Sequence, residues 1–318
     1  MDQHNDTVYH IPALLPQALE GLDIKPGGIY VDATYGGGGH SRAIIDRLNL
    51  DMGGHLYSFD QDEDAVAGAV SDPRFTMVYG NFRYLSNFLR YYGVTGVDGI
   101  LADLGVSFHH FDTAERGFSF RYEGPLDMRM NRKAIHTAAW VLANETPERL
   151  AEIFRLYGEL PNGRQIANAI VTAREQGKAP QTIGDLMEIT ERYIPAQARK
   201  KYLAMMFQAL RIEVNGELDA LTSFLGQTLK VLRPGGRLAI ITYHSLEDRL
   251  VKNFLRYGNV EGERKADFFG RFDPPLKLIT RRPITPDDAE ILANPRSRSA
   301  KLRIAERIAG NSDDDSAS

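Results

Sequence analysis

The sequence predicts an α/β fold, a parallel sheet covered by helices on both faces, into which a separate all-α domain is inserted. Short apolar strands alternate with helical patterns, which is typical of such a sheet. Three of these strands end on an aspartate, namely Asp32, Asp60 and Asp103. More than a hundred residues then separate Asp103 from the next clear strand, which begins at Arg237. Since a simple crossover needs roughly a dozen residues, we expect a second domain between them.

Each expected strand is a short apolar run bounded by turn residues. The first run leads into a glycine turn and a helical pattern over 41–48, and the fifth is entered through Arg233-Pro234-Gly235-Gly236. Two later runs, 276–280 and 299–305, alternate like edge strands, and prolines interrupt the chain between them. The five main runs are 28–32, 55–60, 75–79, 99–103 and 237–242.

The inserted segment has the apolar period of helices. Thr146-Pro147-Glu148 combines an N-cap residue, a proline at the first helical position and an early acid, and Thr182 opens a further helix. We expect the α/β domain to cover 1–111 and 199–318 and the helical, substrate-recognising domain to cover 112–198. A cleft between two such domains is a natural place for a substrate.

The composition is that of a soluble globular protein, with 43% hydrophobic and 25% charged residues in a chain of 318. No apolar run approaches the ~20 residues that cross a bilayer, and the first residues do not form a signal or transit peptide. The chain has no cysteine, which excludes disulfides, thiolate metal sites and a cysteine nucleophile. We therefore expect a cytoplasmic protein and no metal site.

The charge is unevenly placed along the chain. The net charge of −4 argues against a protein that coats nucleic acid over its whole surface. Lysine and arginine nevertheless outnumber acids between Arg281 and Arg307. Such a run is usually a solvated face, and it indicates RNA only if other features do.

The glycine turn after the first strand is Asp32-Ala33-Thr34-Tyr35-Gly36-Gly37-Gly38-Gly39-His40. Glycines between a strand and a helix let the backbone approach a ligand. Asp60, at the end of the next strand, stands where a carboxylate accepts the ribose hydroxyls of adenosine, or else it caps the following helix. Asp103 ends the fourth strand, in the region of the sheet nearest the group that a bound cofactor would transfer, or else it is a buried structural acid. The spacing alone supports a nicotinamide enzyme and a methyltransferase about equally.

The residues themselves resemble a known family over nearly the full chain. The glycine turn is similar to the cofactor loop of the small-subunit ribosomal RNA cytosine-N4 methyltransferases, the MraW family. Six more blocks resemble that family in the same order, among them Asp103-Leu104-Gly105-Val106-Ser107 and Tyr243-His244-Ser245-Leu246-Glu247-Asp248-Arg249. The others are 115–120, 124–130, 207–215 and 294–303.

The resemblance implies a Rossmann-like S-adenosylmethionine-dependent methyltransferase domain with an inserted all-α domain. Its implied reaction is N4-methylation of a cytidine in small-subunit (16S) ribosomal RNA. His110 stands where the family has a glutamine, and Gln17 stands where it has a glutamate. The positions that match the family's contacts to S-adenosylmethionine are Gly38, Gly39, His40, Asp60, Phe82, Asp103 and, with the changed side chain, His110.

For catalysis we hypothesise that Asp103 accepts a hydrogen bond from the cytosine amine while the methyl group transfers. His244, just after the fifth strand, takes the proton or orients the base; a capping or loop histidine is an interpretation that its position supports at least as well. Asp127 and Arg129 are cleft residues or a salt bridge. The expected phosphate contacts are Arg296, Arg298 and Lys301.

The expected partner is small-subunit ribosomal RNA or the assembling small subunit, with no membrane, and a homodimer is left open. One alternative is a methyltransferase with another acceptor, such as DNA cytosine or a different RNA. A second is an RNA-binding or assembly module that kept the fold and lost catalysis, against which the intact Gly38, Gly39, Asp60 and Asp103 weigh. A third is a nicotinamide dehydrogenase.

Overall fold

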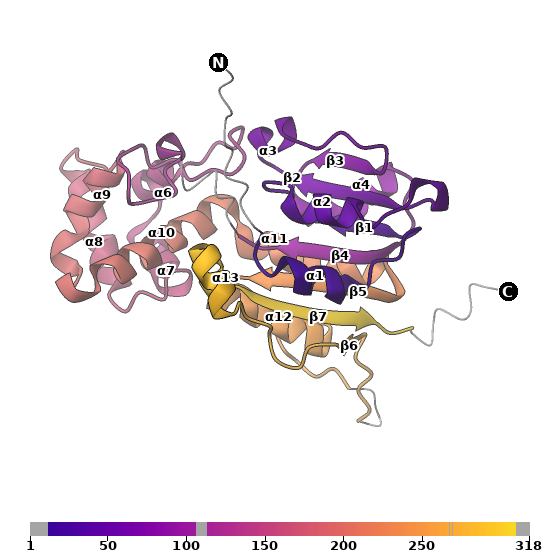
Figure 1. Cartoon of the computed structure of the whole chain (residues 1–318). Coiled ribbons are helices and arrows are strands. Elements are labelled where there is room, and N and C mark those ends of the chain that lie inside the picture. The colour runs from indigo at the N-terminus through magenta and orange to yellow at the C-terminus, as the bar shows by residue number, and fades with distance from the viewer. Residues whose placement is uncertain (1–11, 106–112, 267, 269, 310–318) are drawn as a thin grey trace, which may run out of the picture. The chain divides into compact units, whose positions relative to one another are not determined.

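The computed structural model describes residues 12–105, 113–266, 268 and 270–309. The chain divides into two compact units, one formed by Met1–Gly105 with Ala220–Ser318 and the other by Val106–Asp219 (Figure 1). The second unit therefore continues to Asp219, beyond the expected limit of 198. Among the described residues, no helix combines the length and the apolar character needed to cross a membrane.

The first unit contains a seven-stranded sheet with the order β3-β2-β1-β4-β5-β7-β6. The strands from β3 to β5 are parallel, as expected. β7 pairs antiparallel with both β5 and β6, so it is not the edge strand that its alternating pattern predicted. The alternation is explained by pairing on both sides of β7. The bounds are β1 Ile29–Asp32, β2 His55–Asp60, β3 Phe75–Tyr79, β4 Val97–Asp103, β5 Leu232–Thr242, β6 Leu276–Leu278 and β7 Lys301–Arg307.

β5 begins five residues earlier than the expected run because Leu232 already pairs with Val97. The register then shifts, and regular pairing resumes between Gly99 and Arg237. The Pro234-Gly235-Gly236 stretch occupies this irregularity, where Gly235 has a φ of 78°. Proline and glycine are tolerated here because the ladder is interrupted.

Helices cover both faces of the sheet (Figure 1). One face packs against α4, α11 and α12, and the other packs against α1 and α2. The bounds of the helices and 3₁₀ turns in order are α1 Leu15–Leu22, α2 Gly39–Ile45, η1 Leu50–Met52, α3 Glu63–Ala67, η2 Phe82–Tyr84, α4 Leu85–Tyr91, α11 Glu217–Val231, α12 Ser245–Tyr257, α13 Asp288–Ala293 and η6 Pro295–Ser299.

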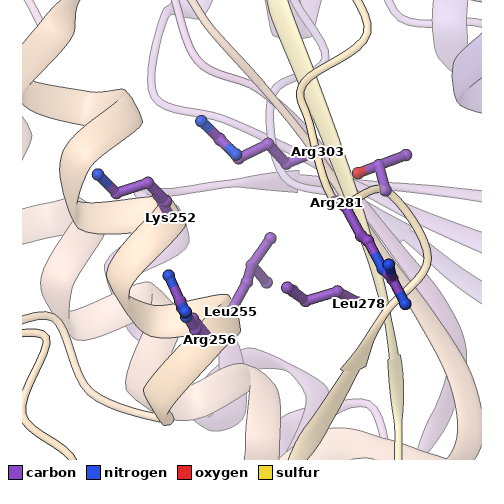
Figure 2. Close-up of a pocket in the computed structure, with 7 residues that line it drawn as sticks. Lys252, Leu255, Arg256, Leu278, Arg281 and Arg303 are labelled. Carbon is purple, nitrogen blue, oxygen red and sulfur yellow. The ribbon is translucent and has the colours of Figure 1, made fainter.

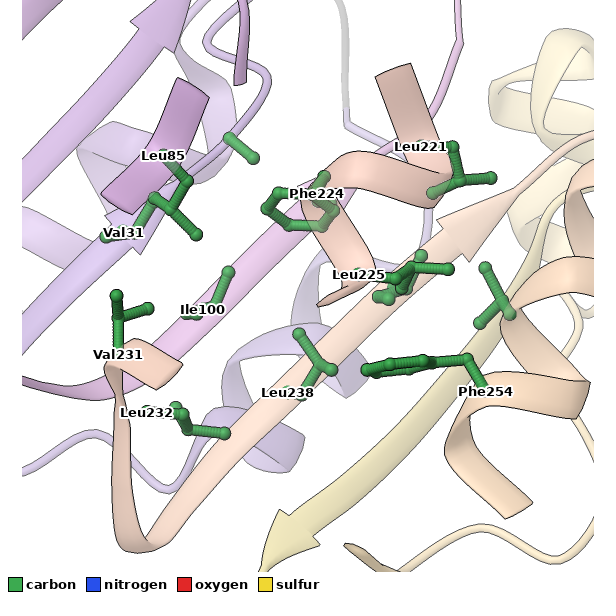
Figure 3. Close-up of a cluster of buried hydrophobic side chains, with 14 of the residues drawn as sticks. Val31, Leu85, Ile100, Leu221, Phe224, Leu225, Val231, Leu232, Leu238 and Phe254 are labelled. Carbon is green, nitrogen blue, oxygen red and sulfur yellow. The ribbon is translucent and has the colours of Figure 1, made fainter. Parts of the chain in front are cut away.

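The alternation of side chains along the strands produces these two apolar layers. Val31 of β1 and Leu238 of β5 point to the face where Phe224 and Phe254 lie, as Figure 3 shows. Tyr30, the neighbour of Val31, packs into the opposite layer. The parallel strands are thus buried on both faces, which is why they appear in the sequence as continuous apolar runs.

The second unit is helical in its regular structure, and its helices pack around one apolar cluster. The expected N-caps are confirmed: Thr146 accepts a hydrogen bond from the Arg149 N–H, and Thr182 forms a capping box. Leu203 and Leu210 of α10 pack into this cluster, which explains why the unit extends past 198. The bounds are η3 Ala114–Arg116, α6 Ala138–Asn144, α7 Pro147–Leu156, α8 Gly163–Glu175, α9 Ile183–Thr190, η4 Glu191–Tyr193, η5 Ala196–Ala198 and α10 Arg199–Asn215.

Candidate active site

The glycine turn follows β1 at the carboxyl edge of the sheet. Gly36 and Gly38 have φ angles of 52° and 75°, in the left-handed region that glycine adopts without strain. A Cβ atom on Gly38 would collide with the ring of Tyr35, so a larger residue is excluded there. A Cβ on Gly36 or Gly37 would meet no heavy atom within 4 Å. The backbone of this turn therefore faces open space, where a ligand could approach it.

Asp60, at the end of β2, fastens the glycine turn. Its Oδ2 accepts the Gly36 N–H at 2.9 Å, and its Oδ1 accepts the Asp62 N–H at 2.9 Å. The N-cap of α3 is Asp62, whose side chain accepts the Asp64 N–H. The helix-capping alternative thus applies to Asp62 and not to Asp60. Asp60 thus holds the turn at the carboxyl edge of the sheet, and a contact with ribose stays a prediction.

Asp32, at the end of β1, is fully buried and surrounded by donors of the chain itself. The Ser41 hydroxyl donates to its Oδ2 at 2.6 Å, and the Thr34 N–H donates to its Oδ1 at 3.1 Å. Ser41 is in turn 2.8 Å from the Ser58 hydroxyl. Burial raises the pKa of Asp32 to about 6, although the nearby His40 and the hydrogen bond from Ser41 oppose this shift. The carboxyl group therefore joins β1, β2 and α2 inside the fold.

Asp103, at the end of β4, is placed differently. Its side chain is 21% exposed, and its Oδ1 accepts a hydrogen bond from the Tyr243 hydroxyl at 2.8 Å. Its backbone N–H donates to the Thr34 hydroxyl at 2.7 Å. Burial raises the pKa of Asp103 to about 7; the hydrogen bond from Tyr243 opposes this shift, and the negative charge of Glu247 adds to it. The group can thus exchange a proton near neutral pH and still reach a ligand.

Tyr243 directly follows β5 and was not singled out by sequence reasoning. Burial, followed by the charge of Asp103, raises the pKa of Tyr243 well above its usual value, so the hydroxyl keeps its proton. A Cβ on Gly105 would lie 3.1 Å from the Tyr243 ring, so the glycine makes room for it. The available signal was the block 243–249, in which Tyr243 stands directly before His244. Sequence alone could not reveal that its hydroxyl reaches across to β4.

His40 lies in the first turn of α2 with its ring buried. Its Nε2 is 3.2 Å from the Ala13 carbonyl oxygen. Because a carbonyl only accepts, Nε2 carries the proton of the neutral ring. Burial lowers the pKa of His40, and Asp32 opposes this shift. Nδ1 lies 3.7 Å from Asp103 Oδ2, and the neutral ring makes this a polar contact and not an ion pair.

His244 takes the capping position that its place in the sequence allowed. It is the N-cap of α12, and its Nδ1 accepts the Glu247 N–H at 3.5 Å. Its Nε2 lies 3.1 Å from Glu247 Oε1, without hydrogen-bond geometry. Glu247 Oε2 accepts the Tyr243 N–H at 3.1 Å. His244 and Glu247 thus fix the backbone that carries Tyr243, and a direct role for His244 in proton transfer stays a prediction.

The remaining expected cofactor residues differ in their surroundings. Gly39 is the first residue of α2, and a Cβ there would collide with the Pro12 ring. Phe82, in η2, packs edge-on against Phe224 with ring centroids 5.2 Å apart. It is only partly buried, so the rest of its ring is open to a neighbour. His110 lies outside the described residues.

Two other expectations concern charged residues that are not among the predicted cofactor contacts. Asp127 and Arg129 form the salt bridge that was one alternative, with Arg129 Nε 2.7 Å from Asp127 Oδ1 and Nη2 2.7 Å from Oδ2. Burial raises the pKa of Asp127, but the hydrogen bonds from Arg129 outweigh it and the net pKa is lowered. Arg296 and Arg298 are exposed on η6, and Lys301 Nζ lies 3.8 Å from Asp248 Oδ2.

An α/β sheet with a glycine turn after β1 and carboxylates at the ends of β2 and β4 defines a nucleotide-cofactor protein. Comparison with known proteins places the chain within that class. The profile of the MraW methylase family matches residues 7–308. The chain belongs to this family and is a methyltransferase.

The chain is similar over its length to curated proteins called ribosomal RNA small subunit methyltransferase H. The protein from Parabacteroides distasonis is 58% identical over 307 residues, which cover 96% of this chain and 100% of that protein. The protein from Phocaeicola vulgatus is 60% identical over 300 residues, covering 94% of this chain and 98% of that protein. The protein from Bacteroides thetaiotaomicron is 56% identical over 305 residues, covering 96% and 99%.

Proposed function

We propose that this chain transfers a methyl group from S-adenosylmethionine to N4 of a cytidine in small-subunit ribosomal RNA. Membership in the MraW methylase family supports the reaction class. The names of relatives that are 56–60% identical support ribosomal RNA of the small subunit as the substrate. The observation that carries the proposal is the arrangement at the carboxyl edge, where Asp103 lies partly exposed at the end of β4 and Asp60 fastens the glycine turn.

The residues at this edge fit S-adenosylmethionine. The open side of Gly36 and Gly37 leaves room for the ligand beside the backbone. Asp60 already orders the turn, and a carboxylate is the kind of group that accepts hydrogen bonds from ribose hydroxyls. Asp103 offers a carboxyl group that favours a positively charged neighbour. Gly38, Gly39, His40 and Phe82 would complete the site, with His40 contributing through its main chain because its ring is buried.

S-adenosylmethionine supplies a methyl group on a positively charged sulfur, which is already strongly activated. The chain's own task is to place the cytosine amine in line and to stabilise the positive charge that develops on nitrogen. In our proposal Asp103 accepts a hydrogen bond from this amine at one carboxylate oxygen. Tyr243 holds the other oxygen at 2.8 Å and so fixes the orientation of the carboxyl group. A cation near Asp103 lowers its pKa and keeps it in the accepting form.

Reaching the amine requires that the cytidine leave its base stack, as enzymes that modify bases demand. We assign recognition of the RNA to the helical unit, Val106–Asp219, and phosphate contacts to the exposed Arg296 and Arg298. Lys301 joins them if RNA competes with Asp248 for its ammonium group. A cytoplasmic location is a further prediction that belongs to this proposal.

The test incubates the purified protein with labelled S-adenosylmethionine and one of three substrates: unmodified small subunits, naked ribosomal RNA, or DNA. Nucleoside mass spectrometry then identifies the product. We expect labelled N4-methylcytidine from a ribosomal substrate. Its absence from both ribosomal substrates would overturn the proposal. Transfer to DNA alone would indicate another acceptor, binding of NADH in place of S-adenosylmethionine would indicate a dehydrogenase, and RNA binding without transfer would indicate an assembly module.

A further inference from the structure

A pocket of about 370 Å³ lies between α12 and the region of β6 and β7, in the first unit. Figure 2 shows Lys252, Leu255 and Arg256 on one helix, with Leu278 and Arg281 opposite. Arg303 and Thr280 complete the lining, and none of the described residues that line the pocket is acidic. Leu255 is buried and Leu278 is partly buried. The pocket thus combines an apolar floor with a cationic rim.

The positive charge of this rim is only partly compensated. The nearby carboxylate is Asp248, whose pKa is raised by burial but lowered on balance, by Arg303 first and also by Lys252. Arg303 is neutralised, because its Nε and Nη2 bind the two oxygens of Asp248 at 2.7 and 3.1 Å. Within the described part of the chain, no ion pair is found for Lys252, Arg256 or Arg281. Lys252 and Arg256 are four residues apart on α12, so they lie on the same face, where like charges repel. An anion between them would relieve this repulsion.

The chemistry of the pocket fits a nucleotide better than a bare anion. Arginine binds phosphate oxygens in pairs, and lysine adds a point charge. An apolar floor accommodates the ribose or base that a phosphate carries. Arg281 and Arg303 belong to the basic run 281–307, for which composition alone indicates a solvated face. The structure places both of them at one pocket together with α12.

The position of the pocket relates it to the candidate active site. α12 begins at Ser245, two residues after Tyr243, which contacts Asp103. Lys252 and Arg256 follow along the same helix, about 10 and 16 Å from its start at 1.5 Å per residue. An RNA strand whose target base enters at Asp103 could therefore reach the pocket within a few nucleotides. The pocket lies outside the set of residues that bind the cofactor.

We propose that this pocket holds one nucleotide of the substrate RNA at a distance from the methylated base. Lys252, Arg256 and Arg281 bind its phosphate, and Leu255 and Leu278 contact its sugar or base. This inference rests on the proposed function for the identity of the polyanion. The pocket adds affinity for RNA without touching the reacting atoms, so its loss raises KM and leaves kcat unchanged at saturating RNA.

The test compares two triple variants with the same change in charge. The pocket variant carries Lys252→Gln, Arg256→Gln and Arg281→Gln. The control carries Arg90→Gln, Lys230→Gln and Lys277→Gln, at exposed positions outside the pocket lining. Lys277 is a close control because it neighbours Leu278 on β6 and alternation sends its side chain to the opposite face. Circular dichroism and calorimetric titration with S-adenosylmethionine check that both variants fold and bind cofactor like the wild type.

Filter binding of unmodified small-subunit ribosomal RNA is measured over a range of salt concentrations. We expect the pocket variant to bind RNA at least tenfold more weakly than the control at ~0.1 M salt. The slope of log affinity against log salt should fall by about 0.7, since the pocket variant loses the contact with one phosphate of single-stranded RNA. Equal RNA affinities and slopes in the two triple variants would overturn the proposal.

Inorganic phosphate serves as the second probe and distinguishes the source of the anion. At constant ionic strength, millimolar phosphate should displace RNA no better than chloride does. Full displacement by phosphate would make the pocket a free-phosphate site and overturn an RNA contact. If the wild type binds RNA through the pocket yet transfers no methyl group, the proposed function fails and the pocket stands. If the wild type methylates and both triple variants match it, the pocket fails and the function stands.

Discussion

The ends of β1 and β4 carry the same residue in different surroundings. Burial raises the pKa values of Asp32 and Asp103 to about 6 and about 7. Asp32 is 0% exposed, and the Ser41 hydroxyl and Thr34 N–H occupy its oxygens. Asp103 keeps a 21% exposed side chain whose Oδ1 is held by Tyr243. A strand-end aspartate is thus structural when the fold supplies its donors, and available to a ligand when the fold leaves one oxygen accessible.

We expect the largest effect on methyl transfer from a substitution that removes the negative charge of Asp103. Asp103→Asn keeps the size of the side chain and can still accept the Tyr243 hydrogen bond, but it removes the negative charge. We expect methyl transfer to fall about 100-fold to 1,000-fold, the scale of one lost electrostatic contact in a transition state. Initial rates with labelled S-adenosylmethionine measure this change.

The free energy of unfolding of Asp103→Asn is measured as a control. Burial disfavours the charged form of Asp103, so Asp103→Asn should lower the free energy of unfolding by no more than ~1 kcal/mol. A variant that is equally stable and retains more than a third of the wild-type rate would show that the carboxylate does not act in the reaction.

Asp32→Ala is expected to lower the stability of the fold, in contrast to Asp103→Asn. It leaves the buried Ser41 hydroxyl and the Thr34 N–H without their acceptor. We expect the free energy of unfolding to fall by about 2–4 kcal/mol, since each unsatisfied buried group costs roughly 1–3 kcal/mol. Urea unfolding followed by circular dichroism measures it. Ser58→Ala, which removes a single hydroxyl from the same network, should cost about 1 kcal/mol, and a loss in Asp32→Ala no larger than this would contradict a structural role.

The raised pKa of Asp32 also sets a pH dependence of stability. Between about pH 4 and pH 6 the folded chain retains a proton that the unfolded chain releases. The stability that this proton contributes is fully present below about pH 4 and is lost as the pH rises through 6. Relative to Asp32→Ala, the wild type should therefore lose stability as the pH rises across this window. Unfolding curves for both proteins at pH 4, 5, 6 and 7 test the sign, and a difference that stays constant would contradict it.

Substitution of Asp60 should have a smaller effect, which is confined to the affinity for the cofactor. Asp60→Ala releases the Gly36 N–H and removes the proposed ribose contact, so we expect cofactor affinity to weaken by at least ~1 kcal/mol, about fivefold. Asp62→Ala is the matched control, because it removes the cap of α3 and leaves the Gly36 hydrogen bond in place. Calorimetric titration with S-adenosylmethionine measures both, and equal affinities would remove Asp60 from the site.

Much of this site could be predicted because strand ends and glycine turns are local features of the sequence. The positions of Asp32, Asp60 and Asp103 at the ends of β1, β2 and β4 follow from apolar runs that stop at a carboxylate. Their different roles could not be predicted, because they depend on contacts between distant segments. The Tyr243 hydroxyl reaches Asp103 across 140 positions of sequence.

Contacts between distant segments also determine the parts of the fold that could not be predicted. The pairing of β7 on both sides was missed because the alternation in 299–305 is shared by edge strands and by the antiparallel interior strand that it forms. The end of the helical unit was missed because an amphipathic helix does not show which cluster it joins. α10 packs its apolar face into the helical cluster, and this becomes visible only in three dimensions.

We propose that Asp103 is the titrating group of the active site and that the Tyr243 hydroxyl adjusts its pKa. We would measure the pH profile of kcat/KM for S-adenosylmethionine in the wild type and in Tyr243→Phe, since this profile reports the ionisation of the enzyme before the cofactor binds. The deprotonated carboxyl accepts the amine hydrogen bond, so the wild-type rate should rise with pH through about 7. The Tyr243 hydrogen bond lowers the pKa of Asp103. The rise of the rate with pH should therefore occur at higher pH in Tyr243→Phe. A flat profile, or one that Tyr243→Phe leaves in place, would contradict the claim.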